Sequence, residues 1–318
     1  MSIAITDDHR SLADTVSSFA EKRDLRGAAR AKLESPDDAL PDFWDEFAEL
    51  GWLGLHLPED VGGSGYGVEE LVVVVEELAR AVAPGPFVPT VIAGAVVAAA
   101  GDDELRASLL PGFANGSTVA AVALGGSVTL SGATASGDAG VALGCGPASL
   151  LLVPAGDDVA IVEVGDGVTI DTPPSLDPTR RSARVTLDGA AATVISGARQ
   201  TLVDLARVIL AADAVGVARE CTDMGAAYSK ERIQFGRPIA MYQGVKHHCA
   251  NMAVATELAT SAVWDAARAA ATGGDQLSYA AAAAATLAAP AADLCANLNT
   301  QVHGGIAITW EHDAHLYM

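Results

Sequence analysis

Apolar residues recur at helical spacing over the first third of the chain. Three stretches place them on one helical face: Leu12, Val16 and Phe19; Phe43, Phe47 and Leu50; and Leu71, Val75, Leu78 and Val82. Prolines and glycines separate these stretches and concentrate in Gly51–Gly67, where we expect an irregular excursion. The pattern predicts an N-terminal helical domain over residues 1–116.

Between residues 117 and 196 the pattern changes to short apolar runs separated by Gly, Ser, Asp and Pro. The runs are Val119–Leu124, Val128–Leu130, Leu150–Val153, Val159–Val164, Arg184–Leu187 and Ala192–Ile195. Short runs at this spacing, with turn residues between them, predict a small antiparallel β-domain. No Gly-x-Gly-x-x-Gly lies between a strand and a helix, so a Rossmann nucleotide-binding unit is not indicated.

Helical spacing returns at residue 197 and continues to the end of the sequence. It predicts three long helices, Leu202–Tyr228, Gly244–Ala271 and the alanine-rich Tyr279–Asn299, the last interrupted at Pro290. Long helices with short connections predict a C-terminal four-helix bundle over residues 197–318. Because the sequence stops at Met318, we expect the bundle to be incomplete and the chain to be a fragment or the first half of a longer one. The whole predicts an α+β multidomain fold.

Composition narrows the class of protein. Half of the 318 residues are hydrophobic, which excludes disorder, and no apolar run reaches the roughly 20 residues needed to span a bilayer. The N-terminus has no basic-then-apolar order, so it is not a secretion signal. The cysteines have neither metal-site nor disulfide-framework spacing: Cys145, Cys221, Cys249 and Cys295. We expect a soluble, cytoplasmic protein.

The net charge of −21 argues against a nucleic-acid partner, whose phosphates would be repelled. An anionic ligand such as a CoA thioester would need a local basic patch. The densest group of arginines is Arg180, Arg181, Arg184 and Arg199. These are either such a patch or ordinary surface charges on a strand pair.

Two motifs carry candidate chemistry. Arg232-Ile233-Gln234-Phe235-Gly236-Arg237-Pro238-Ile239, followed by Gln243, lies between two predicted helices, where a guanidinium beside a turn is suited to a diphosphate. The alternative is an ordinary helix–loop–helix connection. Gln301-Val302-His303-Gly304-Gly305-Ile306 follows another helix, and its glycines allow close approach of a ligand to the backbone, although Gly-Gly also ends helices.

In this order and after a β-domain, the two motifs resemble the acyl-CoA dehydrogenase family. Gly51-Trp52-Leu53-Gly54-Leu55, Pro58-Glu59-Asp60-Val61-Gly62-Gly63-Ser64-Gly65 and Ser229-Lys230-Glu231-Arg232 agree with it, so the resemblance covers nearly the whole chain. It implies bound FAD and oxidation of an acyl-CoA at the Cα–Cβ bond, where a carboxylate removes the α-proton and flavin N5 accepts the β-hydride. It also implies that each FAD is shared between subunits. By position, the residues for the ADP part of a partner's FAD are Arg232, Phe235, Gln243, Gln301, Gly304 and Gly305.

The chain departs from the family pattern where the flavin ring and the base belong. The stretch Ala121–Ser127 has no acid and no hydroxyl on its strand, where the family has both, and Gly137–Leu143 lacks an aromatic and a hydroxyl. Ala206 occupies one family base position, and an alanine cannot accept a proton. On a helix Asp204 projects away from that position, and Asp213 lies roughly two turns further on. The catalytic residue is therefore unknown, and the chain's own flavin-ring pocket is predicted to be degenerate.

The C-terminal stretch Thr309–Tyr317 resembles a subfamily linked to actinobacterial steroid side-chain degradation. In that subfamily unlike subunits pair as α2β2 heterotetramers or are fused in tandem, and one of each pair keeps the flavin and the base. The other family location of the base, a Tyr-Glu-Gly loop, lies beyond Tyr317-Met318. The stretch also holds four candidate metal ligands, which we interpret as a solvated or interface face: Glu311, His312, Asp313 and His315.

The favoured hypothesis is a subunit or half of an FAD-dependent acyl-CoA dehydrogenase, assembled as a dimer or tetramer of such units. The subfamily resemblance alone implies a steroid side-chain CoA thioester as its substrate. The chain contributes the ADP-binding surface while a homologous partner holds the flavin ring, base and substrate. One alternative is a self-sufficient dehydrogenase whose base is Asp204 or Glu220. Others are a structural scaffold of this fold without cofactor and an oxidase that uses oxygen as acceptor.

Overall fold

The computed structural model describes residues 5–34 and 37–318, and the chain divides into two compact units. One unit contains the described residues within Met1–Lys22, Val72–Val82 and Arg207–Met318, and the other those within Arg23–Leu71 and Ala83–Ala206. Helices α4 (Val68–Arg80) and α7 (Arg199–Glu231) each have residues in both units. The predicted boundaries near residues 116 and 196 follow changes of secondary structure, and they stay a prediction.

The second unit begins with helices and short helical turns. They are α2 (Leu25–Glu34), α3 (Trp44–Glu49), η1 (Glu59–Val61), α5 (Phe87–Ala100) and α6 (Asp103–Ala114). Helix α5 is apolar all round, and its residues from Phe87 to Val97 are all buried, as expected for a core helix. Helix α6 begins at an N-cap, where the Leu105 amide donates to Asp102 Oδ1 at 2.8 Å.

An aromatic cluster anchors these helices. Phe47 lies at its centre, with ring centroids 5.1 Å from Phe43, 5.5 Å from Trp52 and 5.5 Å from Phe87. Trp44 packs against the same ring, and its buried indole Nε1 donates to the Gly116 carbonyl oxygen at 2.9 Å. That bond fixes the start of the sheet region, because Gly116 lies just before its first strand.

The sheet of this unit has seven strands in the order β2-β3-β1-β4-β5-β7-β6. The strands are β1 (Ala120–Ala123), β2 (Ser127–Ser131), β3 (Thr134–Leu143), β4 (Leu150–Ala155), β5 (Asp158–Glu163), β6 (Val168–Asp171) and β7 (Ser182–Ile195). An additional β3–β7 pairing joins the sheet to itself, so that β3, β1, β4, β5 and β7 form a closed barrel. The barrel interior is filled by small and branched side chains, among them Ala121, Val153 and Val185.

Three details of the sheet differ from the sequence-based expectation. The sheet is mixed and not purely antiparallel, because β1 and β4 pair in parallel. The runs Arg184–Leu187 and Ala192–Ile195 belong to the single long strand β7. Strands β3 and β6 were not predicted. Strand β3 is rich in Ala and Gly, and its pairing with β7 shifts register at Gly137 and Gly140, whose positive φ angles of 126° and 74° form bulges.

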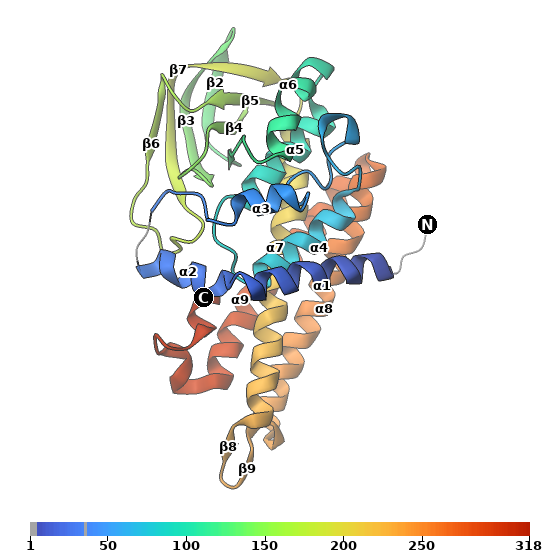
Figure 1. Cartoon of the computed structure of the whole chain (residues 1–318), viewed down its shortest axis with the longest axis vertical. Coiled ribbons are helices and arrows are strands. Elements are labelled where there is room, and N and C mark those ends of the chain that lie inside the picture. Colours follow the sequence, from blue (N-terminus) through green and yellow to red (C-terminus); the bar gives the residue numbers. More distant parts are fainter. Residues whose placement is uncertain (1–4, 35–36) are drawn as a thin grey trace. The chain divides into compact units, whose positions relative to one another are not determined.

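The first unit is helical apart from one hairpin. It contains α1 (Asp7–Lys22), β8 (Ile233–Gln234), β9 (Arg237–Pro238), η2 (Ile239–Met241), α8 (Gln243–Thr272), α9 (Asp275–His303), η3 (Gly304–Ile308) and η4 (Asp313–Tyr317). The β8–β9 hairpin projects past the ends of α7 and α8 at the lower edge of Figure 1. Residues 197–318 form the three predicted long helices, α7, α8 and α9.

Helix α9 is continuous through Pro290, so the expected interruption is wrong. Pro290 is exposed, while Ala284, Ala288 and Ala291 are buried on the face that packs along α8. This packing outweighs the loss of one backbone hydrogen bond at proline. By length and composition alone, Asp275–Ile308 also meets the criteria for a membrane span, which core helices with such an apolar face meet as well.

Candidate cofactor-binding site

All six residues predicted to bind the ADP part of FAD lie in the first unit, at the ends of its long helices. Arg232 and Phe235 belong to the β8–β9 hairpin region, and Gln243 is the first residue of α8. Gln301 lies in the last turn of α9, which ends at His303 and is followed by Gly304 with a φ of 66°. The two motifs are thus brought to the same end of the helices, where the chain turns between α7 and α8 and after α9.

A cleft of about 530 Å³ lies between the two motifs. Its lining residues come from α7, the hairpin and the end of α9: Tyr228, Arg232, Gln234, Ile239, Val302, His303, Gly305 and Ile306. Arg232 and Gly305 therefore line one cleft, whereas the other four predicted residues are not part of its lining. Gln243, Gln301 and Phe235 are exposed side chains around it.

The backbone beyond α9 is open. A Cβ added at Gly304 or Gly305 would meet no atom within 4 Å. An open backbone beside one guanidinium suits a phosphorylated ligand, since N–H groups and Arg both donate to phosphate oxygens. Within this unit, the residues present therefore fit the ADP part of FAD.

The apex of the hairpin has a strained and exposed aromatic residue. Phe235 has a φ of +52° and Gly236 a φ of +79°, the combination of a type I′ turn, and the Phe235 side chain is 95% exposed. Such turns favour Asn-Gly, because a bulky residue at positive φ is disfavoured. The hairpin closes at its base through the Ile239 amide, which donates to the Arg232 carbonyl oxygen at 2.8 Å.

A stack of rings on the wall of the cleft was missed by the sequence analysis. The Tyr228 and His303 rings are stacked with centroids 4.3 Å apart, and His312 lies 4.4 Å from His303 on centroids. His303 Nδ1 is 2.9 Å from the Asn299 carbonyl oxygen, so Nδ1 carries the hydrogen. Burial lowers the pKa of His303 and thus favours its neutral form. The sequence did contain a signal for an aromatic wall beside Arg232: Tyr228 precedes Arg232 by four residues, which is about one helical turn.

The candidate metal ligands of the C-terminal stretch take other partners. His312 belongs to the ring stack, and its Nδ1 accepts the Ala314 amide at 3.1 Å. His315 stacks on Trp310 with ring centroids 5.0 Å apart. Tyr317 is buried, and its hydroxyl donates to the Arg80 carbonyl oxygen at 2.6 Å. The stretch is therefore packed down through aromatic contacts.

In the second unit, the segment expected at the flavin ring is closely packed on itself. All four residues of β1 are buried, and none carries a hydroxyl. The next turn lies directly on β3, because a Cβ at Gly126 would be 2.5 Å from the Asp138 carbonyl oxygen. The Asp138 carboxylate accepts the Gly140 amide at 2.7 Å. The side chains of β1 therefore offer no hydrogen bond to the polar edge of a flavin ring.

The candidate base positions hold no acid suited to the role. Ala206 is completely buried in α7. Asp204 is 2% exposed, and its Oδ1 accepts a hydrogen from Gln200 Nε2 at 2.9 Å. Glu220 accepts from the Arg80 guanidinium at 3.1 and 3.2 Å, so it already balances a cation.

The arginines singled out in the sequence have separate partners. Arg181 forms an ion pair with Asp38 at 3.0 Å, and Arg199 donates to the Gly156 carbonyl oxygen at 3.0 Å. Arg184 is exposed on β7 opposite Asp171 of β6. We interpret these arginines as ordinary surface charges.

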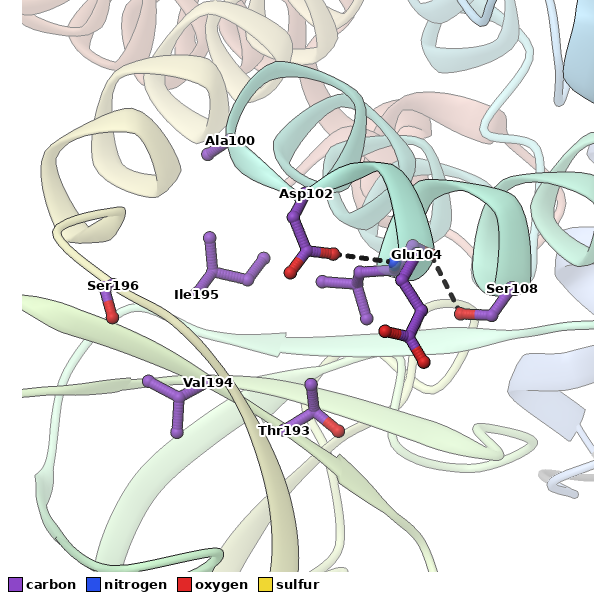
Figure 2. A pocket seen from close by; sticks show the side chains of 9 residues that line it. Ala100, Asp102, Glu104, Ser108, Thr193, Val194, Ile195 and Ser196 are labelled. Carbon is purple, nitrogen blue, oxygen red and sulfur yellow. Dashed lines mark hydrogen bonds between the residues drawn. The ribbon is translucent and has the colours of Figure 1, made fainter.

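A second cavity of about 550 Å³ lies between the α5–α6 corner and the end of β7 (Figure 2). Its polar side chains are Asp102, Glu104, Ser108, Thr193 and Ser196. The side chain of Asp102 is engaged as the cap of α6, and Ser108 Oγ donates to the Leu105 carbonyl oxygen at 3.0 Å (Figure 2). A lining with carboxylates and without a basic residue is unsuited to a diphosphate or a CoA thioester.

Comparison with known proteins assigns the chain to a family. Residues 6–117 match the acyl-CoA dehydrogenase N-terminal domain, and residues 197–318 match its C-terminal domain. Acyl-CoA dehydrogenase FadE34 of Mycobacterium tuberculosis is 40% identical over 330 residues, which cover 100% of this chain and 45% of FadE34. This chain thus spans about half the length of that relative. Acyl-CoA dehydrogenase IpdE2 of Mycolicibacterium smegmatis is 32% identical over 98% of this chain and 92% of its own length.

A solved structure agrees. The Tcur3481-Tcur3483 steroid ACAD G363A variant superposes with a TM-score of 0.88 at 29% sequence identity, covering 98% of this chain and 91% of that one. A helical region, a β-barrel and a second helical region follow one another along the chain, which is the order of the acyl-CoA dehydrogenase fold. The chain belongs to the acyl-CoA dehydrogenase family, whose members use FAD to oxidise CH–CH bonds of acyl-CoA. The resemblance seen in the sequence is confirmed, and so is the predicted fold class.

Proposed function

We propose that this chain is one subunit, or one half, of an FAD-dependent acyl-CoA dehydrogenase that acts on a steroid side-chain CoA thioester. It contributes the ADP-binding part of a shared FAD site, while the flavin-ring pocket and the catalytic base belong to a homologous partner. The observation that carries the proposal is the contrast between two regions: the cleft with Arg232 is open and basic, whereas β1 and Ala206 are buried and apolar.

The residues of the cleft have distinct parts in holding the cofactor. The Arg232 guanidinium offers charge-assisted hydrogen bonds to the diphosphate, and the backbone at Gly304 and Gly305 approaches it without side-chain hindrance. Phe235 presents an apolar face beyond the cleft. When bound, FAD supplies the hydride acceptor for oxidation of the Cα–Cβ bond.

The base is assigned to the partner because no acid of this chain suits the role. Glu220 balances Arg80 and Asp204 accepts a hydrogen bond while buried, which argues against a self-sufficient enzyme. The open cleft argues against a scaffold without cofactor.

The partner and the substrate are proposed from the relatives. FadE34 is about twice as long as the part that matches this chain, which is consistent with a second half of similar size. The steroid substrate is proposed by analogy, and the likeness to the steroid ACAD structure supports it. We propose a cytoplasmic location, which is supported by four described cysteines that form no disulfide: Cys145, Cys221, Cys249 and Cys295.

The test uses the full chain, purified alone and after co-expression with a homologous chain that has the flavin-ring motif. We expect a colourless chain alone and a yellow, active complex. A chain that is yellow and active alone would overturn the shared-site proposal, and a colourless complex would favour a scaffold.

Calorimetric titration of the chain with ADP tests the cleft directly. Arg232→Ala is expected to weaken ADP binding by about 10-fold to 100-fold, the loss typical of a charge-assisted hydrogen bond. Lys230→Ala is the matched control, because Lys230 carries the same charge two residues away on α7 and does not line the cleft. Equal effects of the two variants would indicate general electrostatics and not a site at Arg232.

A further inference from the structure

The β8–β9 hairpin combines two features that are unfavourable for an isolated turn. Phe235 adopts a left-handed conformation that bulky residues rarely take, and its side chain is almost fully exposed, so its own packing does not hold it there. Conformations of this kind persist only when surrounding contacts determine them, and they concentrate at functional positions. The contacts that hold this apex therefore identify residues that position the hairpin.

Two of these contacts converge on the Tyr242 side chain. Its hydroxyl donates to the Gln234 carbonyl oxygen at 3.1 Å, on the residue directly before Phe235. Its ring lies under the Arg237 guanidinium, whose Cζ is 4.2 Å from the ring centroid. Gln234 and Arg237 are paired across the hairpin, so Tyr242 contacts both residues that flank the apex.

The backbone of Tyr242 connects the hairpin to a second predicted cofactor residue. Tyr242 is the N-cap of α8, and Gln243 is the first residue of that helix. The Tyr242 amide donates to the Ile239 carbonyl oxygen at 3.0 Å, and its carbonyl accepts the Lys246 amide at 3.1 Å. One residue thus fixes the start of α8 through its backbone and the hairpin apex through its side chain.

We propose that Tyr242 is a positioning residue for the shared FAD site: it holds the Phe235–Gly236 apex in its left-handed conformation before any ligand arrives. This inference rests on the proposed function for the identity of the ligand. Arg237 adds a second contact to this support, because its guanidinium stacks on the Tyr242 ring. A preformed apex leaves less conformational entropy to be lost on binding, which raises affinity without a direct contact.

The test measures the hairpin and the ligand separately. Tyr242→Phe removes the hydroxyl and keeps the ring under Arg237, whereas Tyr242→Leu removes both contacts. Amide hydrogen exchange of the ligand-free chain at Ile233–Arg237 is expected to accelerate in the order wild type, Tyr242→Phe, Tyr242→Leu. ADP binding is expected to weaken in the same order, by roughly threefold to tenfold for the lost hydrogen bond. The thermal midpoint is expected to stay unchanged, because the hairpin is exposed.

Tyr279→Phe and Tyr279→Leu are the matched controls, since Tyr279 is a tyrosine of α9 that is 73% exposed and remote from the cleft lining. If amide exchange at the hairpin is unchanged in Tyr242→Leu, Tyr242 does not hold the hairpin apex, and the proposal is wrong. Faster exchange with unchanged ADP affinity would overturn the positioning role, while a loss of ADP binding in Arg232→Ala would still support the cofactor site. A wild-type chain that binds no ADP would overturn the proposed function and leave Tyr242 without a ligand to position.

Discussion

The guanidinium of Arg80 donates to one carboxylate oxygen of Glu220 from two nitrogens, at 3.2 Å from Nε and 3.1 Å from Nη2. The pair joins the end of α4 to α7. Glu77, one turn earlier in α4, has its Oε1 3.7 Å from Nη1 of the same guanidinium. Arg80 also contacts Asp223 at 3.0 Å, so one cation serves three carboxylates. Because one guanidinium is shared among three carboxylates, it offsets the negative charge of each carboxylate only in part.

Glu77 is expected to make the unfolding free energy depend on pH in an unusual direction. Burial raises the pKa of Glu77 from 4.5 to about 6, and the nearby Arg80 offsets this only in part. Its stabilising contribution is therefore fully present below pH 4.5 and is lost as pH rises through about 6. Glu77→Gln is expected to raise the unfolding free energy at neutral pH by about 2 kcal/mol.

Chemical denaturation at several pH values checks this, with the exposed Glu21→Gln of α1 as control. The Glu77→Gln variant should lose the part of the pH dependence between 4.5 and 6. A variant less stable than the wild type at neutral pH would contradict the argument and show that the ion pair with Arg80 dominates.

His56 is expected to contribute in the opposite direction in the second unit. Both of its ring nitrogens are buried, and burial lowers its pKa from 6.5 to about 4, offset in part by the Val91 backbone. The neutral ring is compatible with the fold, so its contribution is present above pH 6.5 and lost as pH falls through about 4. The total expected loss is about 3 kcal/mol.

His56→Leu should flatten the stability profile between pH 4 and 6.5, and His247→Gln, at an exposed position of α8, should leave it unchanged. Urea unfolding over this range provides the measurement. A His56→Leu profile as steep as that of the wild type would assign the acid sensitivity to other groups.

The sequence was sufficient to predict elements in which apolar residues repeat with a strong period, and it was insufficient to predict irregular elements. The long helices α7, α8 and α9 were predicted because their apolar residues repeat over many turns. Strand β3 was missed because its pairing depends on bulges at Gly137 and Gly140. Around these bulges, apolar and polar residues do not alternate regularly along the strand. The parallel β1–β4 pair likewise depends on the closure of the barrel, which no local pattern encodes.

The candidate site divides in the same way. The motifs located Arg232 and the glycines after α9, because spacing along the chain is what a motif records. The Tyr228–His303 stack and the Tyr242–Gln234 hydrogen bond join residues of different elements or of a turn. Their proximity follows from packing and turn geometry, so the sequence could only suggest it.

Pro290 offers a test of how helix α9 tolerates proline. The residue is exposed in the middle of a helix whose alanine face packs on α8. Pro290→Ala restores a backbone N–H and removes the ring from the preceding turn, and it is expected to raise the unfolding free energy by about 1–3 kcal/mol. Thermal unfolding checks this. An unchanged midpoint would show that the helix accommodates the ring without strain.

Phe235 provides the sharpest separation between stability and function. Phe235→Asn places Asn-Gly at the type I′ turn, the pair that this turn favours, so the hairpin should become more stable by about 1 kcal/mol. The same change removes the exposed aromatic face that we propose contacts the partner's cofactor. We therefore expect slower amide exchange at the hairpin together with weaker retention of flavin by the complex.

Ile233→Asn is the control, because it removes an exposed apolar side chain from β8 and leaves the apex unchanged. Flavin retention in the co-purified complex is measured by absorbance after gel filtration. If Phe235→Asn retains flavin as well as the wild type, the aromatic side chain has no part in the shared site. A role of the Phe235 side chain at the apex requires that flavin loss be specific to Phe235→Asn. If Ile233→Asn loses as much flavin as Phe235→Asn, the hairpin therefore acts through its general apolar surface.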